Sequence, residues 1–242
     1  MTATASPDLL AHSVILVTGA GSGIGAAVAK SYALSGATVI LLDKTIAKLQ
    51  QVYDDIVQSG GITPAIYPLD LKGATLADYE GLVESVCDNF KQLDGLVHCA
   101  ATLGQIAPVE HQDPTTWLES LHINLTAAYL LTRSCLPLMR KSQHGAIIFT
   151  TDQHKNQAYW SAYGISKAAI EAFSQQLADE LEDEGRVRVN CIDPGDVQTE
   201  LFACAFPGRD PASIPKPEDI TQHYLHLMAK ESLNITGQVI VA

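Results

Sequence analysis

The chain has 242 residues, of which 47% are hydrophobic and 17% charged, so it is long enough for one substantial core and shows no sign of wholesale disorder. Its formal net charge of −12 argues against a nucleic-acid surface or an anionic membrane as the main partner. Met1–His12 lacks the basic start and apolar stretch of a signal peptide, and no apolar run approaches the ~20 residues of a membrane helix, so we expect a cytoplasmic protein.

Strand-like apolar runs alternate with helical patterns along the chain. The predicted strands are Val14–Val17, Thr38–Leu42, one within Ile62–Leu69, Gly95–Cys99, Ala146–Thr150, Arg186–Ile192 and Gln238–Val241. The first predicted helix follows a glycine-rich turn and ends near Leu34. The other predicted helices cover Thr45–Gln58, Leu76–Phe90, Pro114–Met139, Ala162–Glu182 and Glu218–Met228. This alternation predicts an α/β fold with a doubly wound parallel sheet of about seven strands, covered by helices on both faces.

No repeat, low-complexity tract or linker divides the chain, so residues 1–242 are predicted to form a single domain. Val197–Pro217 differs from the rest because it is rich in proline and shows no clear periodicity. Loops of this length inside compact domains are often lids or binding loops. We therefore expect a substrate lid at residues 197–217, with a solvated surface excursion as the alternative.

A glycine-rich turn, Thr18–Gly25, directly follows the first strand and opens a helix. In this turn Gly19 allows the chain to leave the strand sharply, Gly23 allows backbone to approach a pyrophosphate, and Gly25 allows helix and strand to pack closely. The helix start presents unpaired N–H groups and the positive end of its dipole to the phosphates. The context favours dinucleotide binding over an ordinary turn, and the candidate residues are Gly19, Ser22, Gly23, Ile24 and Gly25.

Asp43 ends the second strand, 18 residues after Gly25. A carboxylate at this point can accept hydrogen bonds from both adenosine ribose hydroxyls and would repel a 2′-phosphate, which favours NAD over NADP. No Arg or Lys lies in the glycine loop, although the adjacent Lys44 could weaken the preference. The alternative is an aspartate that caps a turn or a helix.

Tyr163 and Lys167 are four residues apart and share one face of a predicted helix. Tyrosine ordinarily titrates near ~10, and a nearby ammonium group lowers that pKa by stabilising the phenolate. Such a pair can exchange the proton of an alcohol while hydride moves on a nicotinamide. The pattern alone is common on helices, and it gains weight from the glycine loop upstream.

With these motifs in this order, the sequence resembles the short-chain dehydrogenases/reductases from about Val14 to Val241. The resemblance implies a three-layer Rossmann fold, a nicotinamide-dependent enzyme acting on an alcohol or carbonyl substrate, and a homodimer or homotetramer. It implies that Tyr163 is the general acid/base, that Lys167 lowers its pKa and binds the nicotinamide ribose, and that Asn124 positions Lys167 through an ordered water. It also assigns to the cofactor Asp70, Leu71, Ala100, Pro194, Gly195, Val197 and Thr199.

Within that family the sequence resembles the bacterial YciK-like oxidoreductases. This implies the fold but supplies no substrate. The segments that carry the similarity are Leu96-Val97-His98, Asn190-Cys191-Ile192, Ala205-Phe206-Pro207 and Pro217-x-Asp219-Ile220.

The sequence departs from the family pattern at the catalytic serine. Counting back from Tyr163 places Thr150 there, matching forward along the fifth strand places Asp152 there, and Thr151 lies between them. Thr151 is the best hydroxyl candidate for orienting the substrate oxygen, because an ionised aspartate cannot donate a hydrogen bond and would repel an alkoxide. Asp152, together with Cys99 where the family has asparagine, favours the alternative of a catalytically silent nucleotide-binding or scaffold protein.

The five cysteines form no CxxC pair and have no metal-ligand spacing, so we interpret them as reduced, mostly structural thiols. His98 stands beside Cys99, but no third ligand has suitable spacing. We expect no metal site.

Overall fold

The computed structural model describes residues 8–242. Residues 1–7, which make up most of the segment examined for a signal peptide, lie outside the described residues. Within residues 8–242 no helix has the length and apolar character needed to cross a bilayer.

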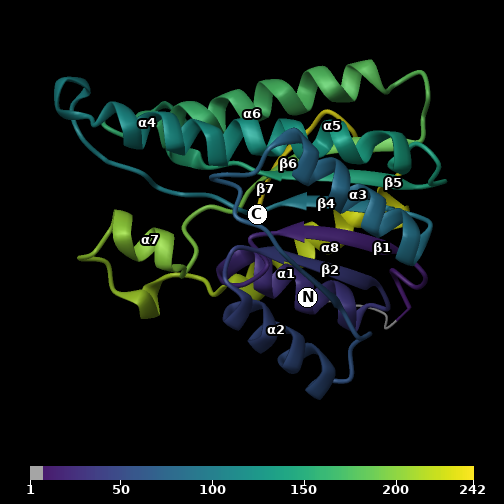
Figure 1. Ribbon diagram of the computed structural model, residues 1–242. Coiled ribbons are helices and arrows are strands. Elements are labelled where there is room, and N and C mark those ends of the chain that lie inside the picture. Colours follow the sequence, from purple (N-terminus) through teal and green to yellow (C-terminus); the bar gives the residue numbers. More distant parts are fainter. Residues whose placement is uncertain (1–7) are drawn as a thin grey trace.

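Seven parallel strands form one sheet in the order β3-β2-β1-β4-β5-β6-β7 (Figure 1). The four strands at its centre and towards β7 are buried at every position, as expected for strands covered on both faces. The predicted parallel sheet is therefore confirmed. The strands are β1 (Val14–Thr18), β2 (Thr38–Asp43), β3 (Ala65–Pro68), β4 (Gly95–His98), β5 (Gly145–Thr150), β6 (Val187–Asp193) and β7 (Val239–Val241).

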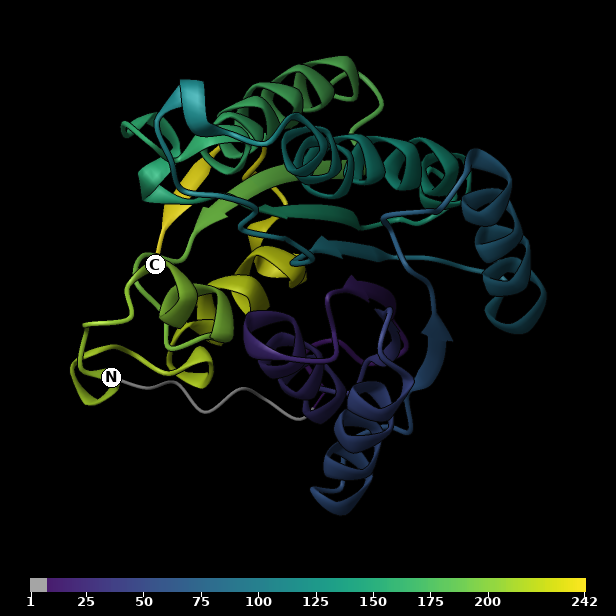
Figure 2. The ribbon, with the colours of Figure 1, turned by 60° about the vertical axis from the view of Figure 1, so that its left-hand side comes forward.

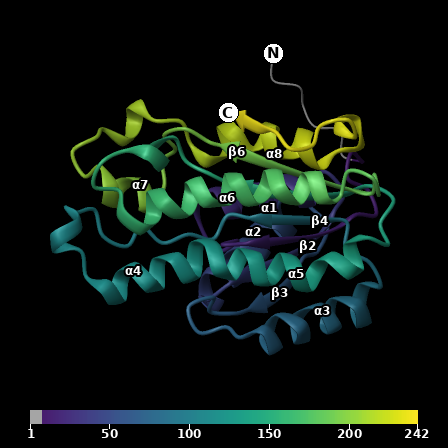
Figure 3. The ribbon, with the colours of Figure 1, turned by 90° about the horizontal axis from the view of Figure 1, so that it is seen from above.

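Helices cover both faces of the sheet (Figures 1 and 3). The helices are α1 (Gly23–Leu34), α2 (Ile46–Gln58), α3 (Leu76–Phe90), α4 (Pro114–Leu121), α5 (Ala127–Met139), α6 (Ser161–Glu180), α7 (Glu200–Ala205) and α8 (Thr221–Met228). One apolar cluster lies between the sheet and α3, α5 and α6, and a second lies between the sheet and α1, α2 and α8. Adjacent residues of β1 belong to different clusters, because successive side chains of a strand point to opposite faces.

Two elements differ from the sequence prediction. The predicted helix Pro114–Met139 is interrupted by a π-helical turn, His122–Thr126, which separates α4 from α5. Such turns insert one residue into the helical repeat and re-aim the side chains that follow. The predicted loop Val197–Pro217 contains α7, whose first turn is capped by the Thr199 hydroxyl accepting the Phe202 N–H at 3.1 Å. Six residues are too few to show a helical period in the sequence.

The chain order reverses between β1 and β4, which lie side by side in the sheet. The connections after these two strands therefore lead away from each other, and a crevice opens at the carboxyl edge of the sheet. Figure 2 shows α7 beside this edge and outside the two helical layers. The fold thus directs any ligand site to the ends of β1 and β4.

Arg188 on β6 is a buried cation, 5% exposed, that ties the sheet to the end of α8. Its guanidinium donates to the carbonyl oxygens of Ala229 at 3.1 Å and Met228 at 3.3 Å, and to the Ser232 hydroxyl. Donors at this place satisfy carbonyl groups that the end of a helix leaves unpaired.

We predict that Arg188→Met lowers the free energy of unfolding by about 2 kcal/mol or more, because it leaves several buried acceptors without a donor. Urea denaturation followed by circular dichroism would measure the loss. Arg186→Met, at an exposed position two residues earlier, is the matched control and should stay within about 0.5 kcal/mol of the unchanged protein. Equal losses in both variants would contradict the role given to Arg188.

Candidate active site

The glycine loop packs against the segment that follows β4. Gly19 has a φ of +66°, and a Cβ atom there would lie 2.8 Å from the backbone of Ala100. A Cβ atom at Gly25 would lie 2.3 Å from the Gly19 carbonyl oxygen. Ser22 precedes α1 with no side-chain cap, and the first turn carries no acidic residue. The first N–H groups of α1 are therefore available to an anionic ligand.

The Thr18 hydroxyl joins the two strands at the crevice, a role that the sequence analysis missed. It accepts the N–H groups of Cys99 and Ala100, each at 3.2 Å. The Cys99 sulfur lies 3.4 Å from the Thr150 hydroxyl oxygen, and burial raises the pKa of the Cys99 thiol to about 11. This cysteine is thus a neutral packing group at the end of β4. The threonine that opens the glycine motif was the signal available in the sequence.

Asp43 lies where the sequence placed it, at the end of β2 and facing the glycine loop. One carboxylate oxygen accepts the Gly21 N–H at 3.3 Å, and the other accepts the Thr45 N–H at 3.0 Å. The side chain thus also caps the turn into α2, as the structural alternative expected. Nearby, Lys48 of α2 forms an ion pair at 3.0 Å with Glu200 of α7.

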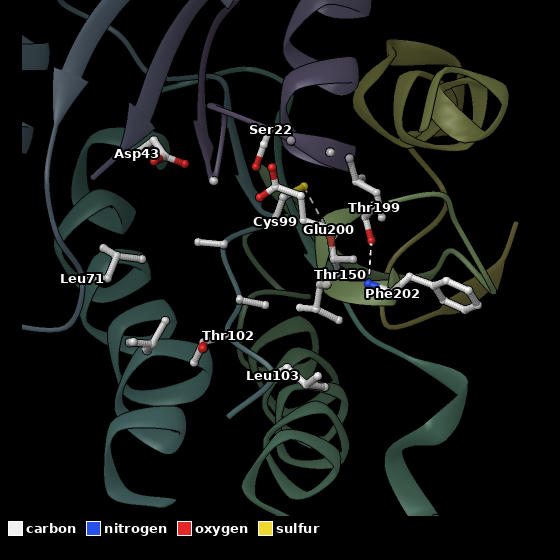
Figure 4. Close-up of a pocket in the computed structure, with 18 of the residues that line it drawn as sticks. Ser22, Asp43, Leu71, Cys99, Thr102, Leu103, Thr150, Thr199, Glu200 and Phe202 are labelled. Atoms are coloured by element: carbon white, nitrogen blue, oxygen red, sulfur yellow. Dashed lines mark hydrogen bonds between the residues drawn. The ribbon is translucent and has the colours of Figure 1, made fainter. Parts of the chain in front are cut away.

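One cavity of about 560 Å³ extends from the glycine loop to Tyr163. Figure 4 shows Asp43 and Leu71 on one side of it and Thr199 and Phe202 on the other. Within residues 8–242, no three His, Cys, Asp or Glu side chains are grouped so that they could hold a metal ion. The cavity brings together every residue predicted to contact a cofactor, namely Gly19, Ser22, Gly23, Ile24, Gly25, Asp43, Asp70, Leu71, Ala100, Tyr163, Lys167, Pro194, Gly195, Val197 and Thr199.

Tyr163 and Lys167 lie on one face of α6 and line this cavity. The Lys167 ammonium donates to the Thr150 carbonyl oxygen at 2.7 Å and lies 5.5 Å from the centre of the Tyr163 ring. Burial lowers the pKa of Lys167. The charges of nearby groups act in the opposite direction and raise this pKa, and Asp152 contributes most among them. We expected Lys167 to lower the pKa of Tyr163, but burial and the Asp152 carboxylate raise it well above the ordinary value.

Asp152, and not Thr151, faces Tyr163. The Tyr163 hydroxyl donates to one Asp152 oxygen at 2.7 Å. Thr151 belongs to the cavity lining, but its hydroxyl points elsewhere and donates to Glu171 at 2.7 Å and to the Lys167 carbonyl at 3.3 Å. This geometry contradicts the expectation that the Thr151 hydroxyl orients a substrate oxygen. Extended backbone at Asp152 sends successive side chains to opposite sides, which explains why Thr151 and Asp152 diverge.

Asn124 sits in the π-helical turn and is buried. Its amide accepts the Thr102 N–H at 2.8 Å and donates to the Thr102 carbonyl at 2.9 Å, so it fixes the segment that follows β4. Asn124 and Lys167 also line a second, small cavity of about 10 Å³. That volume is near the lower limit for holding one water.

The segment after β6 forms a further wall of the cavity. Gly195 has a φ of +63°, and its N–H donates to the buried Asp193 carboxylate at 3.1 Å. A Cβ atom at Gly23 would lie 3.2 Å from the Thr199 methyl group, so the start of α7 passes close to the glycine loop. The residues that the sequence analysis named in this segment line the cavity, but the analysis missed α7, which adds Leu201, Phe202 and Cys204 to the cavity wall.

Comparison with known proteins agrees with this geometry. Residues 13–209 match the family model described as short chain dehydrogenase. The chain belongs to the short-chain dehydrogenase/reductase family of oxidoreductases. The match covers the glycine loop, Asn124 and the Tyr163–Lys167 pair, and it confirms the family resemblance drawn from the motifs.

Individual members of the family are similar over almost the whole chain. The uncharacterized oxidoreductase YciK of Escherichia coli K12 is 41% identical over 232 residues, which are 95% of this chain and 91% of that protein. A short chain dehydrogenase structure from Pseudomonas syringae has a TM-score of 0.96 at 42% identity, covering 100% of this chain and 98% of that chain. One from Shigella flexneri, in complex with NADP, has a TM-score of 0.94 at 41% identity, covering 98% and 99%. The YciK-like resemblance is confirmed.

We predict that Gly25→Ala lowers the free energy of unfolding by about 1–3 kcal/mol, because the added methyl group must displace the Gly19 carbonyl. Gly81→Ala is the matched control, since Gly81 is exposed on α3 and a Cβ atom there meets no atom within 4 Å. That variant should gain about 0.5–1 kcal/mol from the higher helix propensity of alanine. Thermal and urea unfolding of both variants would test this, and a neutral Gly25→Ala would refute the close packing.

Proposed function

We propose that the protein transfers a hydride between a nicotinamide dinucleotide and an alcohol or carbonyl substrate. The observation that carries the proposal is that one cavity contains both the open start of α1 and the Tyr163–Lys167 pair. A glycine cradle binds the phosphates of a dinucleotide, and a tyrosine exchanges protons with an alcohol. Together these groups suit a redox reaction on a small molecule better than either would alone.

The residues of the cavity fit such a cofactor. At Gly19 and Gly25 a Cβ atom would collide with backbone, so the loop is shaped around a close approach of main chain. Ser22, Gly23 and Ile24 would hold the pyrophosphate, Asp43 the adenosine ribose, Asp70 and Leu71 the adenine, and Ala100 and the 194–199 segment the nicotinamide half. When bound, the nicotinamide would supply the hydride donor or acceptor.

The chain's own residues would supply proton transfer and orientation. Tyr163 is the proton-exchanging group, since its hydroxyl is the phenol that reaches the cavity. Lys167 is held by the Thr150 carbonyl and would bind the nicotinamide ribose. Asn124 would position Lys167 through a water held in the small cavity that the two residues share. Pro194, Gly195, Val197 and Thr199 would enclose the reacting end.

We propose NAD as the preferred cofactor, because the Asp43 carboxylate would stand where a 2′-phosphate must go. The relative from Shigella flexneri in complex with NADP favours the opposite choice. Lys44 and Lys48 also line this end of the cavity, and they are the groups that could accept a 2′-phosphate. Lys48 is engaged with Glu200, so it would have to leave that ion pair first.

We propose that residues 1–242 act as a single domain and that residues 197–217, which include α7, form a lid whose apolar side chains select the substrate. Exposed Leu118 on α4, Tyr129 on α5 and Ile165 on α6 would pack against a second copy in a homodimer or homotetramer. Location in the cytoplasm stays a prediction from the sequence.

A catalytically silent nucleotide-binding protein is the second candidate. It is favoured by Asp152, whose carboxylate occupies the place where relatives are expected to carry a substrate-orienting hydroxyl. Both candidates predict cofactor binding, and they differ only in turnover.

A screen of the pure protein with NAD and NADP against secondary alcohols and ketones should give turnover. In Tyr163→Phe we expect kcat/KM to fall about 10²–10⁴-fold, with cofactor affinity nearly unchanged, because only proton transfer is lost. Tyr53→Phe, on α2 and outside the cavity lining, is the control and should keep full activity. Tight cofactor binding without turnover across the panel would favour the silent protein.

The cofactor preference can be measured without a substrate. We expect NAD to bind more tightly than NADP, and we expect Asp43→Asn to reduce the ratio of the two affinities about tenfold or more, because it removes one charged hydrogen-bond acceptor. Fluorescence or calorimetric titration would measure both Kd values. Asp54→Asn, an exposed position on α2, should leave the ratio unchanged. Tighter binding of NADP by the unchanged protein would refute the preference for NAD.

A further inference from the structure

The loop after β5 holds a carboxylate against the tyrosine of the site. The Tyr163 hydroxyl donates to one Asp152 oxygen at 2.7 Å, and both residues line the main cavity. A hydroxyl-bearing side chain at this position could donate to a substrate oxygen, whereas an ionised carboxylate only accepts. The side chain at this position therefore accepts hydrogen bonds, whereas the family pattern has a hydrogen-bond donor here. The inference below rests on the proposed function and concerns the same site.

The second Asp152 oxygen is held by His154. It accepts the His154 backbone N–H at 2.7 Å and lies 2.7 Å from the ring nitrogen Nδ1. The His154 ring is itself fixed, because it stacks on Trp160 with ring centres 4.3 Å apart and lies 5.2 Å from Phe206. The side chains of His154 and Asp152 are only 13% and 17% exposed. One oxygen of Asp152 is thus anchored, and the other is aimed at Tyr163.

The cations around this pair are mostly engaged elsewhere. Lys155 lies 3.0 Å from Glu171 and 4.0 Å from Asp193, which satisfies its charge from α6 and β6. Arg209 pairs with Asp196, which also accepts a hydrogen bond from Gln153 beside the pair. Lys167 remains the cation that interacts with Asp152.

Tyr163 is consequently a phenol and not a poised phenolate. Burial and the Asp152 carboxylate both oppose loss of its proton, so the pKa of Tyr163 is raised well above the ordinary value. Lys167 cannot reverse this effect, because its ammonium donates to the Thr150 carbonyl and lies 5.5 Å from the centre of the phenol ring. A base that accepts the proton of an alcohol must therefore be sought beyond the phenol oxygen.

We propose that Asp152 and Tyr163 act as a single proton-accepting pair, in which Asp152 is the final acceptor and His154 is the residue that positions it. During oxidation of an alcohol, the C–H bond breaks and the hydride leaves with its electron pair to the dinucleotide, which is the oxidant. The O–H bond of the alcohol breaks and its proton goes to the Tyr163 oxygen, while the phenol's own proton goes to Asp152. The alcohol becomes a carbonyl compound, Tyr163 is a phenol again, and Asp152 later releases the proton to solvent.

The two directions of the reaction need opposite protonation states of Asp152. Oxidation needs Asp152 ionised and Tyr163 protonated, whereas reduction needs a proton on both groups. Protonation of Asp152 should therefore slow oxidation, so the rate of oxidation should fall towards acidic pH. If Asp152 is replaced by serine, the phenol becomes the acceptor, and the same fall should move to higher pH, because burial still raises the pKa of Tyr163.

The pair can be tested in the protein without added dinucleotide, by NMR of tyrosine labelled with ¹³C at Cζ. The signal of Tyr163 is assigned by its loss in Tyr163→Phe. We expect this signal to shift in a step at acidic pH, in the folded protein, as the carboxylate gains a proton. The step should vanish in Asp152→Asn and persist in Asp196→Asn, the neighbouring control. No step, or a step that persists in Asp152→Asn, would overturn the pair.

The proton-accepting role is tested by the pH dependence of kcat/KM for a secondary alcohol found in the activity screen. We expect the acidic limb of this profile to move upwards by about 2 units or more in Asp152→Ser. Limbs that coincide in the two proteins would overturn the role. If no alcohol or ketone is turned over while the acid step of Tyr163 is present, the proposed function fails and the hydrogen-bonded pair stands.

His154 is tested by two substitutions. His154→Phe keeps a ring that can stack on Trp160 but removes the Nδ1 group, and His154→Asn keeps a donor near that position. We expect kcat to fall on the order of tenfold in His154→Phe with little change in KM, and to recover in His154→Asn, since misplacement of a reacting group is costly. Equal kcat values in the two variants would remove His154 from the proposal.

Discussion

All seven strands of the sheet run in one direction, and the arrangement of the site depends on that constraint. In a parallel sheet every strand ends at the same edge, so segments that are distant in the chain leave the sheet together. The glycine loop after β1, Asp43 at the end of β2, Asp152 after β5 and Gly195 after β6 meet there for this reason. The reversal of chain order between β1 and β4 then supplies the space between them.

Such an opening would leave backbone donors without partners unless other groups satisfied them. The Thr18 hydroxyl accepts two N–H groups at the end of β4, and the Asn124 amide pairs with both main-chain groups of Thr102. These bonds hold the segment after β4 at the back of the cavity. Because buried backbone groups need partners, Thr18 and Asn124 hold the shape of the main cavity although neither side chain lines it.

The charge balance of the site differs from that of the whole chain. The net charge is −12, yet the cavity contains a helix start with no acidic residue and a buried Lys167. A buried ammonium is costly unless it is paired. Lys167 meets this cost with the Thr150 carbonyl and the nearby Asp152 and Asp193 charges. Asp152 therefore balances the charge of Lys167 and accepts the hydrogen bond of Tyr163. A neutral serine hydroxyl could not balance the charge.

The sequence by itself determined the fold class, because runs of apolar residues and their periods depend on local geometry alone. Every cofactor residue that the sequence analysis named lines the cavity, since the glycine motif, Asp43 and the Tyr163–Lys167 spacing are local patterns. It missed α7 and the π-helical turn at Asn124, because a short capped helix and a one-residue insertion leave no periodic signal. Only the tertiary structure decided that Asp152 and not Thr151 faces Tyr163. That choice depends on the path of the chain where it leaves β5, because in extended backbone a shift of one residue sends a side chain to the opposite side.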